Sequence, residues 1–157
     1  MTIPPTVLTT SFYAFYDLHR PAYQAFAAAR LPADEAQIVV SHIFSLIADR
    51  WIAIVAERAP AAWAWGHLTR AVTRRGARPT TPAEDIALLR DQLQLTVDQI
   101  ATLTGTEDAT VTALLAAADR TAGTLSGPAR HQPVTGRPTG SREARWRDAF
   151  RLRTALA

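Results

Sequence analysis

The sequence predicts an all-α protein, and three observations lead to that fold class. Apolar residues recur every three or four positions along most of the chain, which is the spacing of one helix face. Segments that alternate apolar and polar residues, as strands do, are nearly absent. Hydrophobic residues make up 48% of the 157 positions, which is enough for a packed core. We therefore expect one medium helical domain or two small ones.

Two amphipathic helices are expected at the N-terminal end. The first covers about residues 11–30, where Ser11 can cap the start and Pro21 is expected to bend the helix. The second is a long helix over about residues 34–57. Its expected buried face consists of Val39, Val40, Ile43, Phe44, Ile47, Trp51, Ile54 and Val55.

A third helix over about residues 61–75 completes a three-helix bundle, which we place at residues 1–77. Gly76 is positioned to end this helix. Trp63 and Trp65 are two positions apart and cannot share one helix face. We therefore expect one of them in the core and the other exposed or lining a groove.

A smaller domain with the outline of a helix-turn-helix is expected at residues 83–123. Residues 78–82 form a short linker by composition. The sequences TPAE (81–84) and TVDQ (96–99) are capping boxes, and each predicts the start of a helix. Gly105 is placed at the turn before the last helix of this domain.

Residues 124–157 predict a flexible basic tail with a terminal helix at its end. The first half is rich in glycine and proline and has little to bury, so we expect disorder. The stretch SREARWRDAFRLRTALA either frays or docks weakly as a helix, or contacts nucleic acid or an acidic partner. The candidate tail contacts are Arg142, Arg145, Arg147, Arg151 and Arg153.

The net charge of +3 is unevenly distributed along the chain. Residues 1–79 carry eight arginines against five acidic residues, and residues 125–157 carry seven against two. Residues 80–124, which contain the helix-turn-helix outline, carry two against seven. Because affinity for nucleic acid depends largely on cations that neutralise phosphates, this acidic segment is poorly suited to hold DNA.

Several classes of function are not expected. The chain has no cysteine, which excludes disulfides, thiolate metal sites and a cysteine nucleophile and favours a cytoplasmic setting. We expect no signal peptide, and polar residues interrupt the longest apolar segment, so no membrane contact is expected. The four histidines lie on separate segments without a metal-binding or catalytic spacing. We therefore expect neither an enzyme nor a metal, cofactor or small-molecule substrate.

The order of the motifs resembles a known family. FYAFYDLHRPAY is followed by DEAQIVVSHIF, PAAWAWGHLTRAVTRRG, a linker and DQLQLTVDQIATLTGTEDATV. Over about residues 11–120 this series resembles the small two-domain bacterial sigma factors of the extracytoplasmic-function group. The resemblance implies that the first bundle binds the polymerase clamp and melts the minus-ten element. It also implies that the second domain reads the minus-thirty-five element.

The second helix departs from the family pattern at the positions that face the polymerase. The family carries an acidic pair and then a Gln-Glu or Gln-Asp pair, where this sequence has Gln37, Ile38, Ser41 and His42. An isoleucine in place of a carboxylate leaves a polymerase arginine without its partner, so clamp binding should be weaker. The candidate polymerase-facing or partner surface is Gln37, Ser41 and His42.

The end of the third helix is the best candidate for contact with DNA in the folded part. Arg70, Arg74, Arg75 and Arg78 form a basic cluster suited to phosphates. A solvated helix end whose cations favour the carboxyl terminus explains the same residues equally well.

The last helix of the helix-turn-helix lacks the arginines that the family carries there. Each good base contact contributes about 1–3 kcal/mol of discrimination, and only Arg120 could make one with a guanidinium. Glu107 and Asp108 at its amino end would repel phosphate. The degenerate surface comprises Thr112, Ala113, Ala116, Ala117, Asp119 and Arg120. We expect it to serve for packing or for a protein partner.

Three functions remain open. The main hypothesis is a sigma-like transcription regulator that acts mainly through protein contact, with core RNA polymerase or another transcription regulator as partner. DNA is a weaker candidate partner, through Arg70 to Arg78 and the tail. One alternative is a divergent but working sigma factor in which these arginines compensate for lost contacts. The other is a protein-binding module without a link to transcription.

Overall fold

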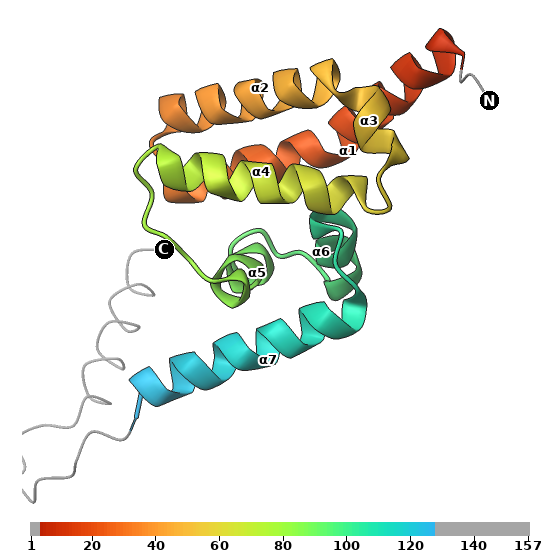
Figure 1. Ribbon diagram of the computed structural model, residues 1–157. Helices are drawn as coiled ribbons and strands as arrows, with labels where there is room; N and C mark the ends of the chain where they lie inside the picture. The colour runs from red at the N-terminus through yellow and green to blue at the C-terminus, as the bar shows by residue number, and fades with distance from the viewer. Residues whose placement is uncertain (1–3, 128–157) are drawn as a thin grey trace, which may run out of the picture. The chain divides into compact units, whose positions relative to one another are not determined.

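The computed structural model describes residues 4–127, and every regular element in this part is a helix (Figure 1). The all-α prediction is therefore confirmed. No helix among these residues is long and apolar enough to cross a membrane. The helices are α1 (Pro5–Arg30), α2 (Ala33–Asp49), α3 (Trp51–Ala56), α4 (Pro60–Arg74), α5 (Pro82–Asp91), α6 (Val97–Thr104) and α7 (Asp108–Leu125).

The start of α1 differs from the prediction. The helix begins at Pro5, whose ring sets a helical φ and whose missing N–H is not needed in the first turn. Ser11 therefore lies inside the helix, where its hydroxyl donates to the Leu8 carbonyl at 2.9 Å. The predicted cap at Ser11 is wrong, because Pro5 extends the helix toward the N-terminus. Pro21 lies inside α1 without ending it.

The predicted long second helix is divided into α2 and α3. Arg50, with φ −114° and ψ 13°, interrupts the helix, and its N–H donates to the Ile47 carbonyl. Beyond the break, the Trp51 indole N–H donates to the Ser11 hydroxyl at 2.9 Å. Its ring packs against Phe12 and Phe15 at centroid distances of 5.6 Å and 5.3 Å. These contacts with α1 are long-range in sequence, so local periodicity could not reveal them.

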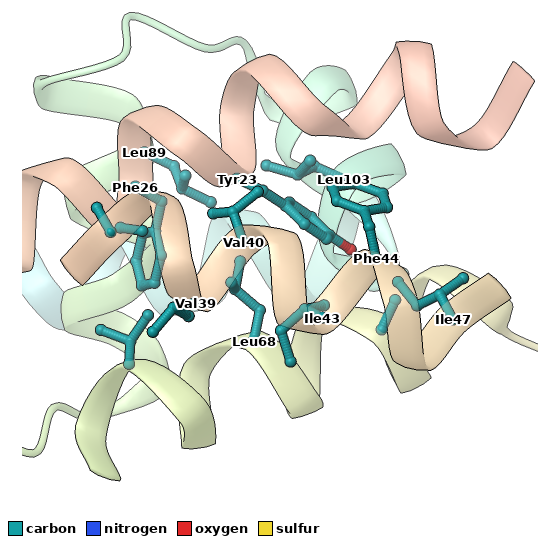
Figure 2. Close-up of a cluster of buried hydrophobic side chains, with 14 of the residues drawn as sticks. Tyr23, Phe26, Val39, Val40, Ile43, Phe44, Ile47, Leu68, Leu89 and Leu103 are labelled. Carbon is teal, nitrogen blue, oxygen red and sulfur yellow. The ribbon is translucent and has the colours of Figure 1, made fainter. Parts of the chain in front are cut away.

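One hydrophobic core joins the first four helices to α5 and α6. Tyr23 of α1 and Leu68 of α4 are fully buried, and the inner face of α2 lies between their helices. Figure 2 shows Leu89 of α5 and Leu103 of α6 in the same cluster. The chain up to Leu125 forms one compact unit. The predicted linker therefore connects two groups of helices that pack on one another.

Both predicted capping boxes are confirmed. The Glu84 N–H donates to the Thr81 hydroxyl at 3.2 Å, and the Glu84 carboxylate accepts from the Thr81 N–H at 2.7 Å. Thr96 and Gln99 repeat the arrangement at the start of α6, at 3.2 Å and 2.9 Å. Each box satisfies two N–H groups that the first turn of a helix leaves unpaired.

Gly105 lies where the turn between α6 and α7 meets α4. Its φ of 66° is left-handed, and its N–H donates to the Ala101 carbonyl, which ends α6 as predicted. A Cβ at this position would lie 2.3 Å from the backbone nitrogen of Ala62 and 2.8 Å from its Cα. Because the obstacle is helix backbone, only a glycine allows the turn to approach α4 this closely.

A buried ion pair ties the end of α1 to α5. Nη1 of Arg30 lies 3.6 Å from Oδ1 of Asp85, and only 6% and 10% of the two side chains are exposed. Thr80 donates to the same carboxylate oxygen at 2.5 Å, and Arg30 also donates to the Arg78 carbonyl. Burial raises the pKa of Asp85, although Thr80 and Arg30 both act to lower it. Loss of either charge would therefore leave the other desolvated without compensation.

Gly105→Ala should lower the free energy of unfolding by about 2–5 kcal/mol. Left-handed strain costs about 1–2 kcal/mol, and the clash with Ala62 adds a packing cost of about 1–3 kcal/mol. Gly76→Ala is the matched control, because Gly76 also has a positive φ but open space around its Cβ position. Urea denaturation followed by circular dichroism measures both losses. Equal losses would contradict the close approach of the turn to α4.

Asp85→Ala should lower the free energy of unfolding by about 3–5 kcal/mol, because it leaves Arg30 buried without a counter-charge. Arg78→Ala breaks the exposed pair with Glu84 instead, and should cost far less because water screens these charges. Thermal and chemical denaturation of the two variants gives the comparison. A loss for Asp85→Ala as small as that for Arg78→Ala would show that the buried pair does not hold α5 against α1.

Candidate functional site

Two of the three α2 positions that were predicted to face a partner line a groove beside α1. Gln37 and Ser41 lie on the wall of a hollow of about 320 Å³ between the two helices. Phe12 and Tyr16 of α1 and Phe44 of α2 supply its aromatic lining. We call this hollow the α1–α2 groove. Its mixture of aromatic and neutral polar groups is typical of surfaces that contact proteins.

The neighbouring exposed positions extend this surface. Ile38 is 47% exposed, and His42 is exposed on the same helix without lining the groove. Arg20, which lines the groove, lies 5.5 Å over the Tyr16 ring. The structure therefore brings Gln37 and Ser41 together at the groove and places His42 outside it.

The basic cluster predicted at the end of α4 is divided by the fold. Arg75 donates to Glu35 at 2.7 Å, and Arg78 donates to Glu84 at 3.0 Å. Both pairs are exposed, and both neutralise cations that were expected to meet phosphate. Arg70 and Arg74 form no ion pair among the residues that the structure describes.

Arg70 and Arg74 lie instead around a second hollow of about 320 Å³, together with Arg50 and His67. We call it the arginine hollow. Burial lowers the pKa of His67, and the charges of Arg70, Arg50 and Arg74 lower it further. The hollow is therefore a site of concentrated positive potential. Sequence reasoning missed His67 and Arg50, although the spacing of residues 67, 70 and 74 already placed three of the four on one face of α4.

Both tryptophans of α4 are half-buried, so the prediction that one is core and one is exposed is wrong. The Trp65 ring packs on Phe26 of α1 at a centroid distance of 4.7 Å. The Trp63 ring covers His67 of its own helix at 3.9 Å. Each tryptophan of α4 thus packs against one further ring, Trp65 against Phe26 and Trp63 against His67. The sequence spacing alone could not identify these partners.

The outward surface of α7 carries almost no positive charge. Thr112, Ala113 and Ala116 are exposed, whereas Ala117 is half-buried and so only partly belongs to the predicted surface. The correction arises because α7 packs along α5 as well as α6. Asp119 accepts hydrogen bonds from Arg90 at 2.8 Å and 3.1 Å, and these bonds lower the pKa of Asp119. Arg120 is exposed.

The structure places His19, one of the four histidines without a metal-binding or catalytic spacing, in the core between α1 and α6. Its ring stacks on Phe15 at a centroid distance of 3.9 Å, and Nδ1 lies 2.9 Å from the Phe15 carbonyl oxygen. Nε2 is buried and has no hydrogen-bond partner in the described part of the chain. Burial lowers the pKa of His19, although backbone carbonyls of Phe15 and Thr102 oppose that shift.

Two further predictions concern metals and the tail. Between residues 4 and 127, no group of three or more His, Cys, Asp or Glu side chains could hold a metal ion. The tail contacts Arg142, Arg145, Arg147, Arg151 and Arg153 and the predicted terminal helix lie outside the described residues.

Comparison of the chain with protein-family models, with curated proteins and with solved structures finds no match. The resemblance to small sigma factors therefore remains a prediction from the sequence.

Acidification from about pH 7 to pH 5 should destabilise the protein, and His19→Phe should reduce this dependence. The pKa of His19 is lowered below 6.5 in the folded state. Its contribution to stability is therefore present above pH 6.5 and is lost as the pH falls through the lowered folded value. Phenylalanine keeps the stack on Phe15 but cannot ionise.

Urea denaturation at several pH values measures how the free energy of unfolding changes with pH. His42→Gln is the control, because it removes an exposed histidine of α2 and leaves the buried imidazole in place. Identical slopes for the wild-type chain and His19→Phe would contradict the role given to the buried imidazole.

Proposed function

We propose that this chain is a transcription regulator, similar to the small sigma factors, that acts mainly through protein contact and reads promoter DNA weakly. Core RNA polymerase is the first candidate partner, and another transcription regulator is the second. The observation that carries the proposal is the outward face of α7, which is neutral where a DNA reader needs cations.

Electrostatics of α7 support this proposal. Residues 80–124 contain only two arginines, and Arg90 is held by Asp91 and Asp119 at 2.6 Å and 2.8 Å. Arg120, the other arginine of this segment, forms no ion pair with any residue between 4 and 127. Seven acidic residues in the same segment oppose the approach of a polyanion. A specific contact between α7 and base edges would have to form against this field.

The packing of α7 also supports weak reading of DNA. The α6–α7 turn lies on α4 through Gly105, and α7 packs along α5. Its inner face is committed to the core through Val111 and Leu115. The face that stays available carries Thr112, Ala113 and Ala116, whose side chains offer a single hydroxyl. That hydroxyl already donates to the Asp108 carbonyl at 2.9 Å.

The α1–α2 groove is the surface that we propose for the protein partner. Its aromatic lining can take apolar side chains, and Gln37 and Ser41 can form neutral hydrogen bonds. It lacks the carboxylates that the resemblance implies at these positions, so binding to polymerase is expected to be weaker than that of the family.

Ser41→Arg should weaken binding to purified core RNA polymerase by about tenfold or more, because it introduces an unpaired charge into the contact. Thr112→Arg is the matched control on the exposed face of α7, and it should leave polymerase binding unchanged. Both positions are exposed, so neither substitution should unfold the chain. Biolayer interferometry with the full chain immobilised measures the affinities.

Two outcomes would contradict the proposal. One is polymerase binding that is insensitive to Ser41→Arg but lost in Thr112→Arg. The other is sequence-selective retention of duplex DNA by the wild-type chain at physiological ionic strength, which would favour a working sigma factor. Specific run-off transcripts upon addition to core polymerase would support that alternative directly. Absence of any polymerase binding would favour a module without a link to transcription.

A further inference from the structure

Four arginines of the first 90 residues are engaged in ion pairs with carboxylates: Arg30, Arg75, Arg78 and Arg90. Arg50, Arg70 and Arg74 are different, because none of them has a carboxylate within 4 Å in the described part of the chain. All three line the arginine hollow, and the lining contains no acidic side chain. Like charges held around one hollow repel one another and cost folding energy. An arrangement of this kind is favourable once an anion occupies it.

Two helices bring these groups together. His67, Arg70 and Arg74 follow one another at spacings of three and four residues, which places them on one face of α4. Arg50 comes from the break after α2, a helix that packs against α4. Burial is the main cause of the lowered pKa of His67, and the three nearby guanidinium groups lower this pKa further.

We propose that the arginine hollow binds a compact phosphate group, such as the terminal phosphate or diphosphate of a small ligand. The guanidinium groups of Arg50, Arg70 and Arg74 supply planar forks of N–H donors that match phosphate oxygens. His67 supplies a further donor from an imidazole nitrogen. The lining contains no carboxylate, hydroxyl or thiol, so its polar groups are the three guanidinium groups and the imidazole.

Convergence of the cations favours a compact anion over a nucleic-acid backbone. Phosphates along one DNA strand follow one another about every 3.4 Å of helix axis, and proteins meet them with cations spread along a surface. Here four groups from two helices surround a single hollow. Its volume of about 320 Å³ lies at the small end of ligand pockets, which suits a phosphate with little else attached.

This inference does not rest on the proposed function. The hollow lies between α2 and α4, and its lining shares no residue with the α1–α2 groove. Loss of polymerase binding would leave the anion site untouched, and loss of the anion site would leave the groove untouched. The two experiments can therefore fail separately.

Isothermal titration calorimetry of the full chain with pyrophosphate tests the site. Arg50→Gln should weaken binding by about tenfold or more, because it removes a charge-assisted hydrogen bond. Arg58→Gln is the matched control, since Arg58 is exposed and lies outside the hollow. It removes the same charge and should change the affinity less than twofold. Background binding to the seven arginines of residues 125–157 is equal in both variants.

A second readout follows the imidazoles by nuclear magnetic resonance. Pyrophosphate should move the His67 ring resonances and raise the pKa of His67, because the anion counters the surrounding guanidinium groups. The exposed His42 on α2 is the internal control and should not respond.

Equal weakening by Arg50→Gln and Arg58→Gln would overturn the proposal, since it would show binding through overall charge alone. Unmoved His67 resonances at saturating pyrophosphate would overturn it as well. A third measurement repeats the calorimetric titration with a single-stranded oligonucleotide that has a 5′-hydroxyl. If it binds more tightly than pyrophosphate and is weakened by Arg50→Gln, the hollow serves a nucleic-acid backbone and the compact-anion assignment is wrong.

Discussion

The arrangement of the helices depends on the close approach of the α6–α7 turn to the first turn of α4. Because Gly105 has no Cβ, α6 can lie against the bundle and bury Ile100 and Leu103 in the common core. The ion pair between Arg30 and Asp85 provides a second contact, from the end of α1 to α5. Helices α5, α6 and α7 are thus attached to the first four helices at two separate places.

Ion pairing distinguishes the arginines at the joints between helices from those around the arginine hollow. Arginines at the joints between helices neutralise nearby carboxylates, as Arg75 does with Glu35. Arginines around the hollow between α2 and α4 have no such partner in the described residues. The net charge counts paired and unpaired arginines equally. It therefore says little about which surface could bind an anion. The exposed face of α7 is nearly neutral, whereas the arginine hollow is strongly basic, so the local charge of this protein differs from one surface to another.

Local signals predicted much of the fold. Fold class, both capping boxes and the turn at Gly105 follow from patterns within a few residues, where hydrogen bonding and backbone conformation decide the outcome. The break at Arg50 and the early start of α1 were missed, because contacts of Trp51 with distant residues and the proline at the N-terminus override periodicity. The same limit applies to the sites. Spacing placed Arg70 and Arg74 together, but only tertiary packing adds Arg50.

The phenol of Tyr23 gives this core an intrinsic optical reporter. Its side chain is fully buried, its hydroxyl has no hydrogen-bond partner among the described residues, and burial strongly raises its pKa. A tyrosinate at this position can therefore form only when the helices separate and water enters. Tyr13, on the same helix, is 59% exposed, so its hydroxyl does not share this enclosure. Ultraviolet difference absorbance in alkaline solution thus follows loss of the shared interior through the phenol of Tyr23.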